Sequence, residues 1–189
     1  MKYSKSAIRS CMSDCKNYLD TYSLPSWDEL PAIDLYMDQV IELINGYINP
    51  PDHILGANAE ITRPMINNYV KLKMMPAPEK KRYSKTHLAY IIIICTLKQT
   101  LNISTIQKIL PTDIPQEEVI YLYDSFVKNQ KSAYSFVSKQ ADSIAAPIVK
   151  KKEDNSSRID DLIMQIASTA NILKCITEKV MDYPEIKSE

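Results

Sequence analysis

The chain has 189 residues, 45% of them apolar, and its 23 basic side chains balance its 23 acidic side chains. This length fits one domain, or one domain with a helical extension, and the apolar share is enough to form a hydrophobic core. Tight hairpins and phosphate-binding loops need the positive φ that glycine supplies, but the chain has only two glycines. The composition therefore argues against a β-rich fold and a glycine-rich nucleotide loop, and we expect a mainly α protein with little or no β structure.

The first 33 residues are expected to contain a short helix and an irregular connector. Four residues within 1–20 share one helical side: Ile8, Met12, Cys15 and Leu19. This region has no apolar stretch long enough for a secretory signal. Trp27, the only tryptophan, lies in the connector, where we expect it to fill the core; an exposed anchor for a partner protein is the alternative.

Residues 34–48 have the pattern of an amphipathic helix that ends at Pro50-Pro51. Its apolar residues are expected to be buried: Leu35, Val40, Leu43, Ile44 and Tyr47. Asp38 and Glu42 lie on the opposite side, which faces water. From residue 20 to residue 62 there are eight acids and no Lys or Arg, so the outer surface of this helix is acidic.

A second, shorter helix is predicted to begin after Thr62, a suitable N-cap, with Pro64 in its first turn. Its apolar face consists of Met65, Ile66, Tyr69 and Leu72. The opposite face has no carboxylate and consists of Arg63, Asn67 and Lys71, with Asn68 on its flank. Arg and Asn make bidentate contacts with guanine and adenine edges, and Lys suits phosphate, so this face is suited to DNA.

The loop that follows, residues 76–83, contains two prolines that hold it extended. Three consecutive cations are expected on a short exposed turn: Lys80, Lys81 and Arg82. Residues 63–85 contain seven basic residues and one acid, a net charge of +6. A basic helix followed by a basic loop is typical of nucleic-acid binding; the alternative is a solvated polar surface, which describes most lysine-rich loops.

Ser84 is predicted to cap a third helix that contains the uninterrupted apolar run of residues 88–95. Four isoleucines in this run favour a strand. The cap and the continuous pattern through Gln99 favour a helix instead, and one that is too short to cross a membrane. Asn102 is expected to end this helix in a left-handed conformation, and Ser104 to cap a last short helix.

This order of elements resembles the DNA-binding domain of the MerR-like winged helix-turn-helix regulators. The similarity covers residues 61–110 and rests on four segments: 62–72 as recognition helix, 76–83 as wing, 82–84 leading into the third helix and 101–104 leading into the fourth. It implies a winged helix-turn-helix domain over residues 34–110, in which the 34–48 helix comes first and residues 49–60 are an insertion. The wider segment 24–110 is also similar to a bacterial domain family of unknown function.

The resemblance implies a cytoplasmic, sequence-specific transcriptional regulator that binds double-stranded DNA and has neither enzymatic activity nor a cofactor. Its DNA-binding residues would be Arg63, Asn67, Asn68, Lys71, Lys73, Lys80, Lys81, Arg82 and Tyr83. The first four would enter the major groove, the cations of the loop would contact the flanking backbone, and Tyr83 would anchor the wing to the core. The alternative is a helical protein-interaction module that does not bind DNA.

Residues 111–189 are predicted to form a helical dimerisation or effector region. A helix from Gln116 to about Ala145 carries an apolar stripe: Val119, Leu122, Tyr123, Phe126, Val127, then Ala133, Phe136 and Val137. Pro147 is expected to interrupt it, and residues 150–157 to form a polar linker. Three tyrosines could line a pocket for a small-molecule effector, with half-buried packing as the alternative: Tyr121, Tyr123 and Tyr134.

A last helix is expected from Arg158 to about Met181, capped by Ser157. Its apolar face is wide for a helix at the end of a chain: Ile159, Leu162, Ile163, Ile166, Ala170, Leu173, Ile176 and Val180. Either the 116–145 helix of the same chain or a partner subunit is expected to cover this face. The second alternative agrees with the resemblance, which implies a homodimer joined through the C-terminal helices.

Little in the sequence supports catalysis or metal binding. Cys11 and Cys15 lack the spacing of a metal site. Two other cysteines are expected to be buried thiols, as in a reducing cytoplasm: Cys95 and Cys175. The two histidines, His53 and His87, lie in different elements, and His87 is expected to be structural or exposed. Because no nucleophile motif is present, we expect no enzymatic site.

Overall fold

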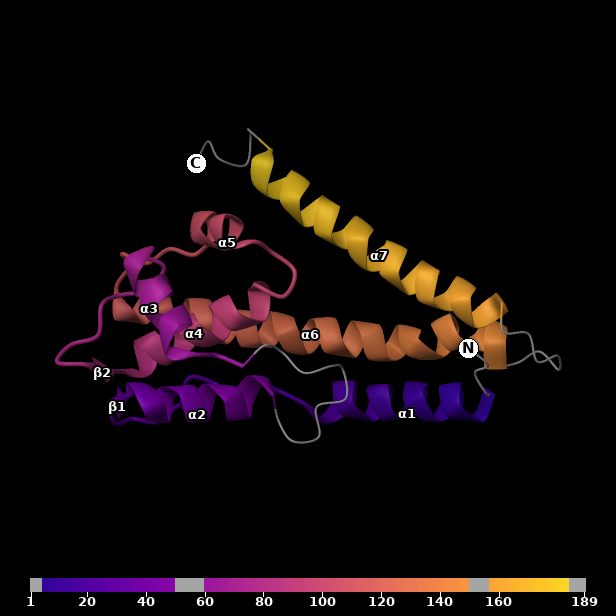
Figure 1. Ribbon diagram of the computed structural model, residues 1–189, viewed down its shortest axis with the longest axis horizontal. Coiled ribbons are helices and arrows are strands. Elements are labelled where there is room, and N and C mark those ends of the chain that lie inside the picture. Colours follow the sequence, from indigo (N-terminus) through magenta and orange to yellow (C-terminus); the bar gives the residue numbers. More distant parts are fainter. Residues whose placement is uncertain (1–4, 50–59, 150–156, 184–189) are drawn as a thin grey trace. The chain divides into compact units, whose positions relative to one another are not determined.

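The computed structural model describes residues 5–49, 60–149 and 157–183 (Figure 1). Seven helices and one two-stranded sheet follow each other in these residues: α1 (Lys5–Thr21), β1 (Leu35–Tyr36), α2 (Met37–Ile48), α3 (Arg63–Lys71), β2 (Arg82–Tyr83), α4 (Lys85–Leu97), α5 (Ile103–Ile109), α6 (Gln116–Val149) and α7 (Ser157–Asp182). The predicted mainly α fold is confirmed for this part of the chain.

The chain divides into two compact units. The core unit is Ser23–Ser132, and the terminal unit consists of Met1–Tyr22 together with Ala133–Glu189. The division into regions that was predicted from the sequence, with boundaries after residues 33 and 110, stays a prediction. None of the described helices combines the length and the apolarity that crossing a lipid bilayer requires.

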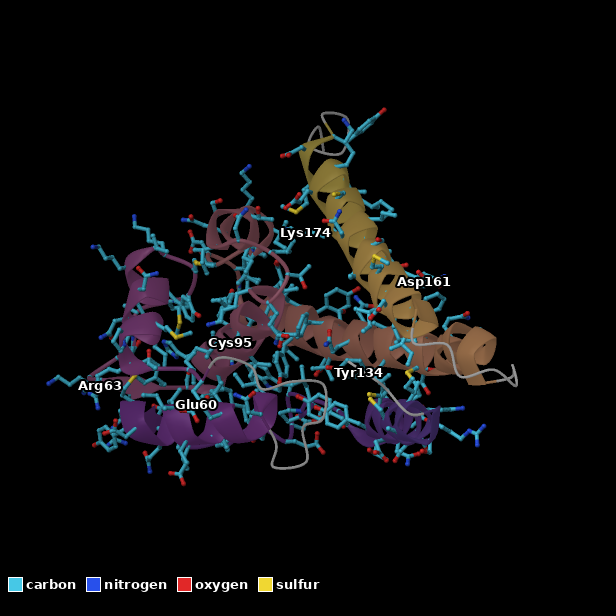
Figure 2. All side chains as sticks on the ribbon, turned by 45° about the vertical axis from the view of Figure 1, so that its right-hand side comes forward. Glu60, Arg63, Cys95, Tyr134, Asp161 and Lys174 are labelled. Atoms are coloured by element: carbon cyan, nitrogen blue, oxygen red, sulfur yellow. The ribbon has the colours of Figure 1, made fainter. Side chains whose placement is uncertain are left out.

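Helix α4 is the centre of the core unit. Every side chain from His87 to Cys95 is buried, and Figure 2 shows Cys95 surrounded by side chains. A helix that is apolar on all sides needs cover on all sides, so the uninterrupted run forms a helix, as predicted. Ser84 is its N-cap, also as predicted, and the Ser84 N–H donates to Nδ1 of His87 at 3.0 Å.

The sheet is antiparallel and pairs Leu35 with Tyr83 and Tyr36 with Arg82. The prediction of one helix over residues 34–48 was therefore wrong at its start, because α2 begins only at Met37. The Tyr36 N–H donates to Oε1 of Gln39 at 2.9 Å, which satisfies a backbone donor at the start of α2. Strand pairing with residues far along the chain overrides the helical periodicity at this point.

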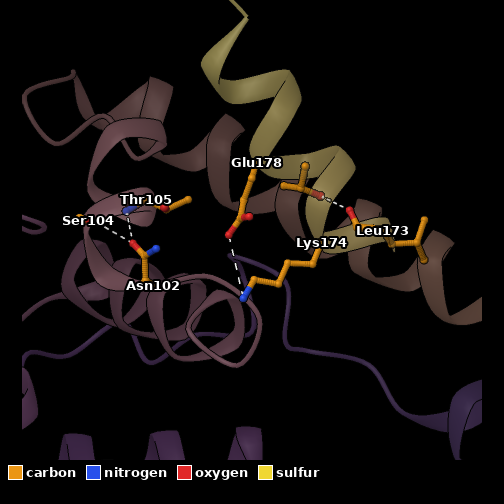
Figure 3. Close-up of polar contacts among 7 residues, drawn as sticks. Asn102, Ser104, Thr105, Leu173, Lys174 and Glu178 are labelled. Atoms are coloured by element: carbon orange, nitrogen blue, oxygen red, sulfur yellow. Dashed lines mark hydrogen bonds and ion pairs between the residues drawn. The ribbon is translucent and has the colours of Figure 1, made fainter. Parts of the chain in front are cut away.

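Asn102 lies at the start of α5 with φ −75° and ψ 159°, not in the left-handed conformation expected for it. Its side-chain oxygen accepts the Thr105 N–H at 2.8 Å and the Ser104 hydroxyl at 2.6 Å (Figure 3). Asn102, not Ser104, is therefore the N-cap of α5. Both predictions for this turn were wrong because Asn and Ser are equally good caps, so the local sequence does not decide between them.

The connector before β1 is fixed to the first half of α6. Trp27 is 7% exposed, which confirms that it fills the core. Its indole packs edge-on against Tyr123, with ring centroids 6.3 Å apart, and the backbone N–H of Trp27 donates to Oδ1 of Asp124 at 3.0 Å. The Tyr123 hydroxyl donates to the Pro25 carbonyl at 2.8 Å. These contacts place the start of α6 in the core unit.

The terminal unit contains α1, the second half of α6 and α7. The Ser138 hydroxyl of α6 donates to the Asp20 carboxylate of α1, and the rings of Tyr22 and Tyr134 lie 5.7 Å apart. Ile159 and Leu162 of α7 pack against Ile8 of α1 and are buried. Contacts between distant parts of the sequence therefore hold this unit together.

One prediction for α6 was wrong. The helix runs on to Val149, so Pro147 does not interrupt it. Phe136 is 66% exposed and Val137 is 46% exposed, so the apolar stripe is not buried in its second half. Residues 150–156 of the predicted linker lie outside the described residues.

Candidate nucleic-acid interface

The four predicted major-groove residues share the exposed side of α3: Arg63, Asn67, Asn68 and Lys71. The opposite side of α3 is fixed by Ile66, which is fully buried, and Tyr69, which is 2% exposed. Thr62 has the extended backbone of an N-cap, and Pro64 lies in the first turn, as the sequence predicts. Burial of one side thus presents a polar face of α3 that carries no carboxylate of its own.

Arg63 links this face to α2 and to β2. Its guanidinium pairs with the Asp38 carboxylate in the first turn of α2, and the two side chains are 56% and 82% exposed. Figure 2 shows Arg63 at the outer edge of the core unit. Burial raises the pKa of the Tyr83 hydroxyl, and the nearby charge of Arg63 opposes that rise. The charge of Arg63 therefore acts on both the Asp38 carboxylate and the Tyr83 hydroxyl.

The three cations of the basic loop are the last three residues of a tight turn over residues 79–82. The turn is closed by the Arg82 N–H, which donates to the Glu79 carbonyl at 2.8 Å. Its two central residues, Lys80 and Lys81, have φ values of 47° and 64°. Positive φ at both central positions defines a type I′ turn, in which Asn-Gly is the preferred pair. A left-handed conformation costs an ordinary side chain roughly 1–2 kcal/mol. Both lysines are exposed.

Arg82 and Tyr36 form a pair on the exposed surface of the sheet. The guanidinium lies 5.0 Å from the centre of the Tyr36 ring, and its Nη2 donates to the Tyr36 hydroxyl at 3.1 Å. Tyr36 is 53% exposed. Tyr36 cannot be recognised as a site residue from the sequence, because only the pairing of β1 with β2 brings it to the basic turn.

Tyr83 has a different environment from the other predicted site residues. It is 3% exposed and packs edge-on against His87, with ring centroids 5.6 Å apart. This position between the turn and α4 is compatible with the predicted anchor of the wing. Because the side chain is buried, it cannot contact DNA directly.

Lys73 is a third lysine with a left-handed backbone, at φ 55°. It follows α3, where the Met74 N–H donates to the Tyr69 carbonyl at 2.9 Å and the Lys73 N–H to the Val70 carbonyl at 3.0 Å. These two bonds form a Schellman motif, whose left-handed position is usually glycine. Lys73 is exposed, so α3 ends in another cation held in an unfavourable conformation.

An open hollow of about 420 Å³ lies beside α3 and is lined by Pro64, Met65, Asn68, Tyr69, Lys98, Leu101, Asn102 and Ile103. None of the tyrosines suggested for an effector pocket lines it. Tyr121 is 77% exposed and Tyr123 is fully buried, so these two do not share a pocket. A small-molecule effector stays a prediction.

Cys95 and His87 are both buried in the core unit. Burial raises the pKa of Cys95 to about 11, whereas Cys175 is exposed, contrary to expectation. His87 is 7% exposed, and burial lowers its pKa. His53 lies outside the described residues. Within the described residues, no three or more His, Cys, Asp or Glu side chains are grouped so that they could hold a metal ion.

No curated protein and no solved structure matches this chain. Residues 25–134 match the family described as Domain of unknown function (DUF1836), and this segment includes the polar face of α3, the basic turn and the β1–β2 pair. The match agrees with the predicted similarity to a domain family of unknown function, while the similarity to MerR-like regulators remains a prediction. With more than half of its length matched, the chain belongs to the DUF1836 family.

Proposed function

We propose that the core unit is a winged helix-turn-helix domain that binds double-stranded DNA, and that the protein is a sequence-specific transcriptional regulator acting in the cytoplasm. In this proposal α2 and α3 form the helix-turn-helix, and the turn at residues 79–82 is the tip of the wing. The observation that carries it is the pair of exposed lysines at the two left-handed positions of that turn.

Folding alone does not account for lysine at these positions. Asn-Gly would form the same turn without the conformational cost, whereas each lysine costs roughly 1–2 kcal/mol. The conformational cost is explained if the two ammonium groups serve a function. We propose that they contact DNA phosphates on either side of the groove that α3 enters. Arg82, fixed against Tyr36, would add a third contact.

The contact between α2 and the entry to α3 supports a helix-turn-helix, although residues 50–59 of the predicted insertion lie outside the described residues. Oδ1 of Asn45 in α2 accepts the Ile61 N–H at 2.8 Å. Ile61 itself is 1% exposed and lies just before α3. This bond holds the entry to α3 against α2 whatever the length of the chain between them. At nine residues, α3 is about 14 Å long, enough to lie across a major groove.

The acidic surface of α2 is compatible with DNA binding, because its carboxylates either pair with Arg63 or face away from the duplex. Asp38 pairs with Arg63, and an exposed pair of this kind contributes at most about 1 kcal/mol. A phosphate can therefore replace Asp38 as the partner of Arg63. The exposed Glu42 would face away from the duplex, because phosphates repel it.

The test measures binding of the full chain to a fluorescent duplex of mixed sequence by anisotropy at increasing salt. In the variant K80N/K81G the turn is retained and relaxed, so we expect the free energy of unfolding to rise by about 1 kcal/mol or more. DNA affinity should fall, and the slope of log affinity against log salt should decrease by about 1.8, which corresponds to two lost phosphate contacts.

The matched control is K128Q/K131Q, which removes two exposed lysines of α6 within the same core unit. This control should bind like the unmodified chain. Absence of binding at low salt, or equal binding by K80N/K81G and the control, would contradict the proposal. The alternative of a protein-interaction module is favoured by one observation, the exposed apolar side of α7.

A further inference from the structure

Helix α7 exposes most of its large apolar side chains. Those that are between 43% and 59% exposed, including one just beyond the helix end, are Ile163, Met164, Ile166, Ile172, Leu173, Ile176, Val180 and Tyr183. Monomeric proteins rarely expose a contiguous apolar patch of more than a few hundred Å², so the surface of α7 needs a partner.

The spacing along α7 specifies the kind of partner. Eight positions follow each other at alternating intervals of three and four residues: Ile159, Leu162, Ile166, Thr169, Leu173, Ile176, Val180 and Tyr183. Seven of the eight are apolar or aromatic. This is the a/d pattern of a coiled coil, whose period of 3.5 residues keeps one seam facing another helix. A second helix with the same repeat matches this interval along its whole length, so a helix is the partner that the spacing fits.

The a and d positions of α7 carry no charge, and its charged residues lie at outer heptad positions except Arg158 and Lys179, which flank the seam. Lys174 and Glu178 form an ion pair of 4.0 Å at i,i+4 (Figure 3), at heptad positions that face away from the a/d seam. Asp160 and Asp161 also lie at outer positions of the heptad. The seam carries no charge that would need an oppositely charged partner, and a surface with the same apolar repeat would therefore complement it.

The start of the seam is already covered within the chain. Ile159 and Leu162 are 7% and 8% exposed because Ile8 of α1 packs against them. The open part of the seam begins at Ile166 and continues to Tyr183, a length of about 27 Å. A partner helix must therefore pair with an open segment of about this length. It must also end before the part of α7 that Ile8 covers.

We infer that the open part of α7, residues 166–183, pairs with the same segment of a second copy of the chain in an antiparallel coiled coil. In this arrangement a positions meet d positions, so Leu173 faces Ile176 of the partner subunit and Ile166 faces Tyr183 of the partner subunit. Two such seams bury on the order of 1,000 Å² in total, the lower limit for a specific interface.

The antiparallel direction follows from the contact with Ile8. In a parallel pair the covered ends of both helices would meet at the same end of the coil, and the two α1 helices would compete with the partner for that space. In an antiparallel pair the covered ends lie at opposite ends, and both intrachain contacts remain. This inference does not depend on DNA binding, and its test contains no DNA.

The first experiment measures the mass of the full chain in solution by light scattering over a range of concentrations. The unmodified chain should be a dimer and L173E/I176E a monomer. Both replaced side chains are more than half exposed, so the variant should still fold, which circular dichroism checks. M164E is the matched control, because Met164 is 59% exposed but lies on the opposite side of the heptad, and it should remain dimeric.

The second experiment tests direction by oxidative cross-linking in a background in which Cys175 is replaced by serine. L173C mixed with I176C should form a cross-linked heterodimer, whereas each variant alone should cross-link poorly. Efficient cross-linking of each variant alone would overturn the antiparallel arrangement. A monomeric unmodified chain at all concentrations, or loss of the dimer in M164E, would overturn the seam itself.

Discussion

Helices α4 and α7 are both rich in isoleucine and leucine, but their surroundings are opposite. Nine consecutive side chains of α4 are buried, whereas α7 buries Ile159 and Leu162 at its start and leaves its later apolar positions half exposed. The apolar residues of α4 have no helical periodicity and are enclosed by the core unit, while those of α7 repeat every 3.5 residues. The comparison teaches that periodicity, more than apolar content, distinguishes a helix that completes a core from one that requires a partner.

The largest expected effect tests this difference directly. Leu88 of α4 is fully buried, so L88A should lower the free energy of unfolding by about 2–5 kcal/mol through lost contacts and a cavity. Under conditions in which the chain is monomeric, L173A in α7 should change it by less than about 0.5 kcal/mol. Urea denaturation of both variants checks this, and equal losses would contradict the contrast between the two helices.

A smaller effect is the pH dependence of stability that His87, at the start of α4, should cause. Burial lowers the pKa of His87, and the Ala77 carbonyl and the Asp34 and Glu79 carboxylates only partly offset this. The unfolded chain then binds a proton more readily than the folded chain. The free energy of unfolding should therefore be highest above the ordinary histidine pKa of about 6.5. Below that pH it should fall by up to about 1.4 kcal/mol per pH unit.

The measurement is urea denaturation between about pH 7.5 and pH 5.5, a range in which only histidine normally titrates. H87N keeps a side-chain acceptor near the Ser84 N–H and cannot become charged, so its stability should change less over this range. An H87N variant with the same pH dependence as the unmodified chain would show that His87 is not the cause.

The smallest effect on stability is expected at the surface of the core unit. D38N removes the ion pair with Arg63, and because both side chains are exposed, the free energy of unfolding should change by less than about 1 kcal/mol. If Arg63 binds phosphate, the same variant should bind DNA a few-fold more tightly. Anisotropy titration at low salt measures this, and weaker binding by D38N would contradict the competition between Asp38 and phosphate.

Local signals were sufficient to predict most helices. The cap at Ser84 and the continuous apolar run predict α4, and Thr62 with Pro64 predicts the start of α3. Strand β1 could not be predicted, because its pairing with β2 depends on residues far along the chain. Pro147 was misjudged because a proline raises the cost of a helix without deciding whether surrounding contacts compensate for it.

For the candidate site, the sequence predicts which residues are cationic and which side of α3 is polar. It does not predict the left-handed backbone of Lys80 and Lys81, since lysine is not a residue that normally favours that conformation. Nor does it predict the contact between Arg82 and Tyr36, which exists only once the two strands have paired. The part of the site that depends on tertiary contacts therefore cannot be predicted from the sequence.

The left-handed lysines have a consequence for how the family evolves. If only folding mattered, mutation would tend to replace Lys80 and Lys81 with asparagine and glycine, because these substitutions relieve strain and keep the turn. Relatives that share the role of this turn should therefore retain Lys or Arg at both sites. Relatives that have lost it should drift toward Asn-Gly, and the dipeptide at these two positions would then separate the two groups without an experiment.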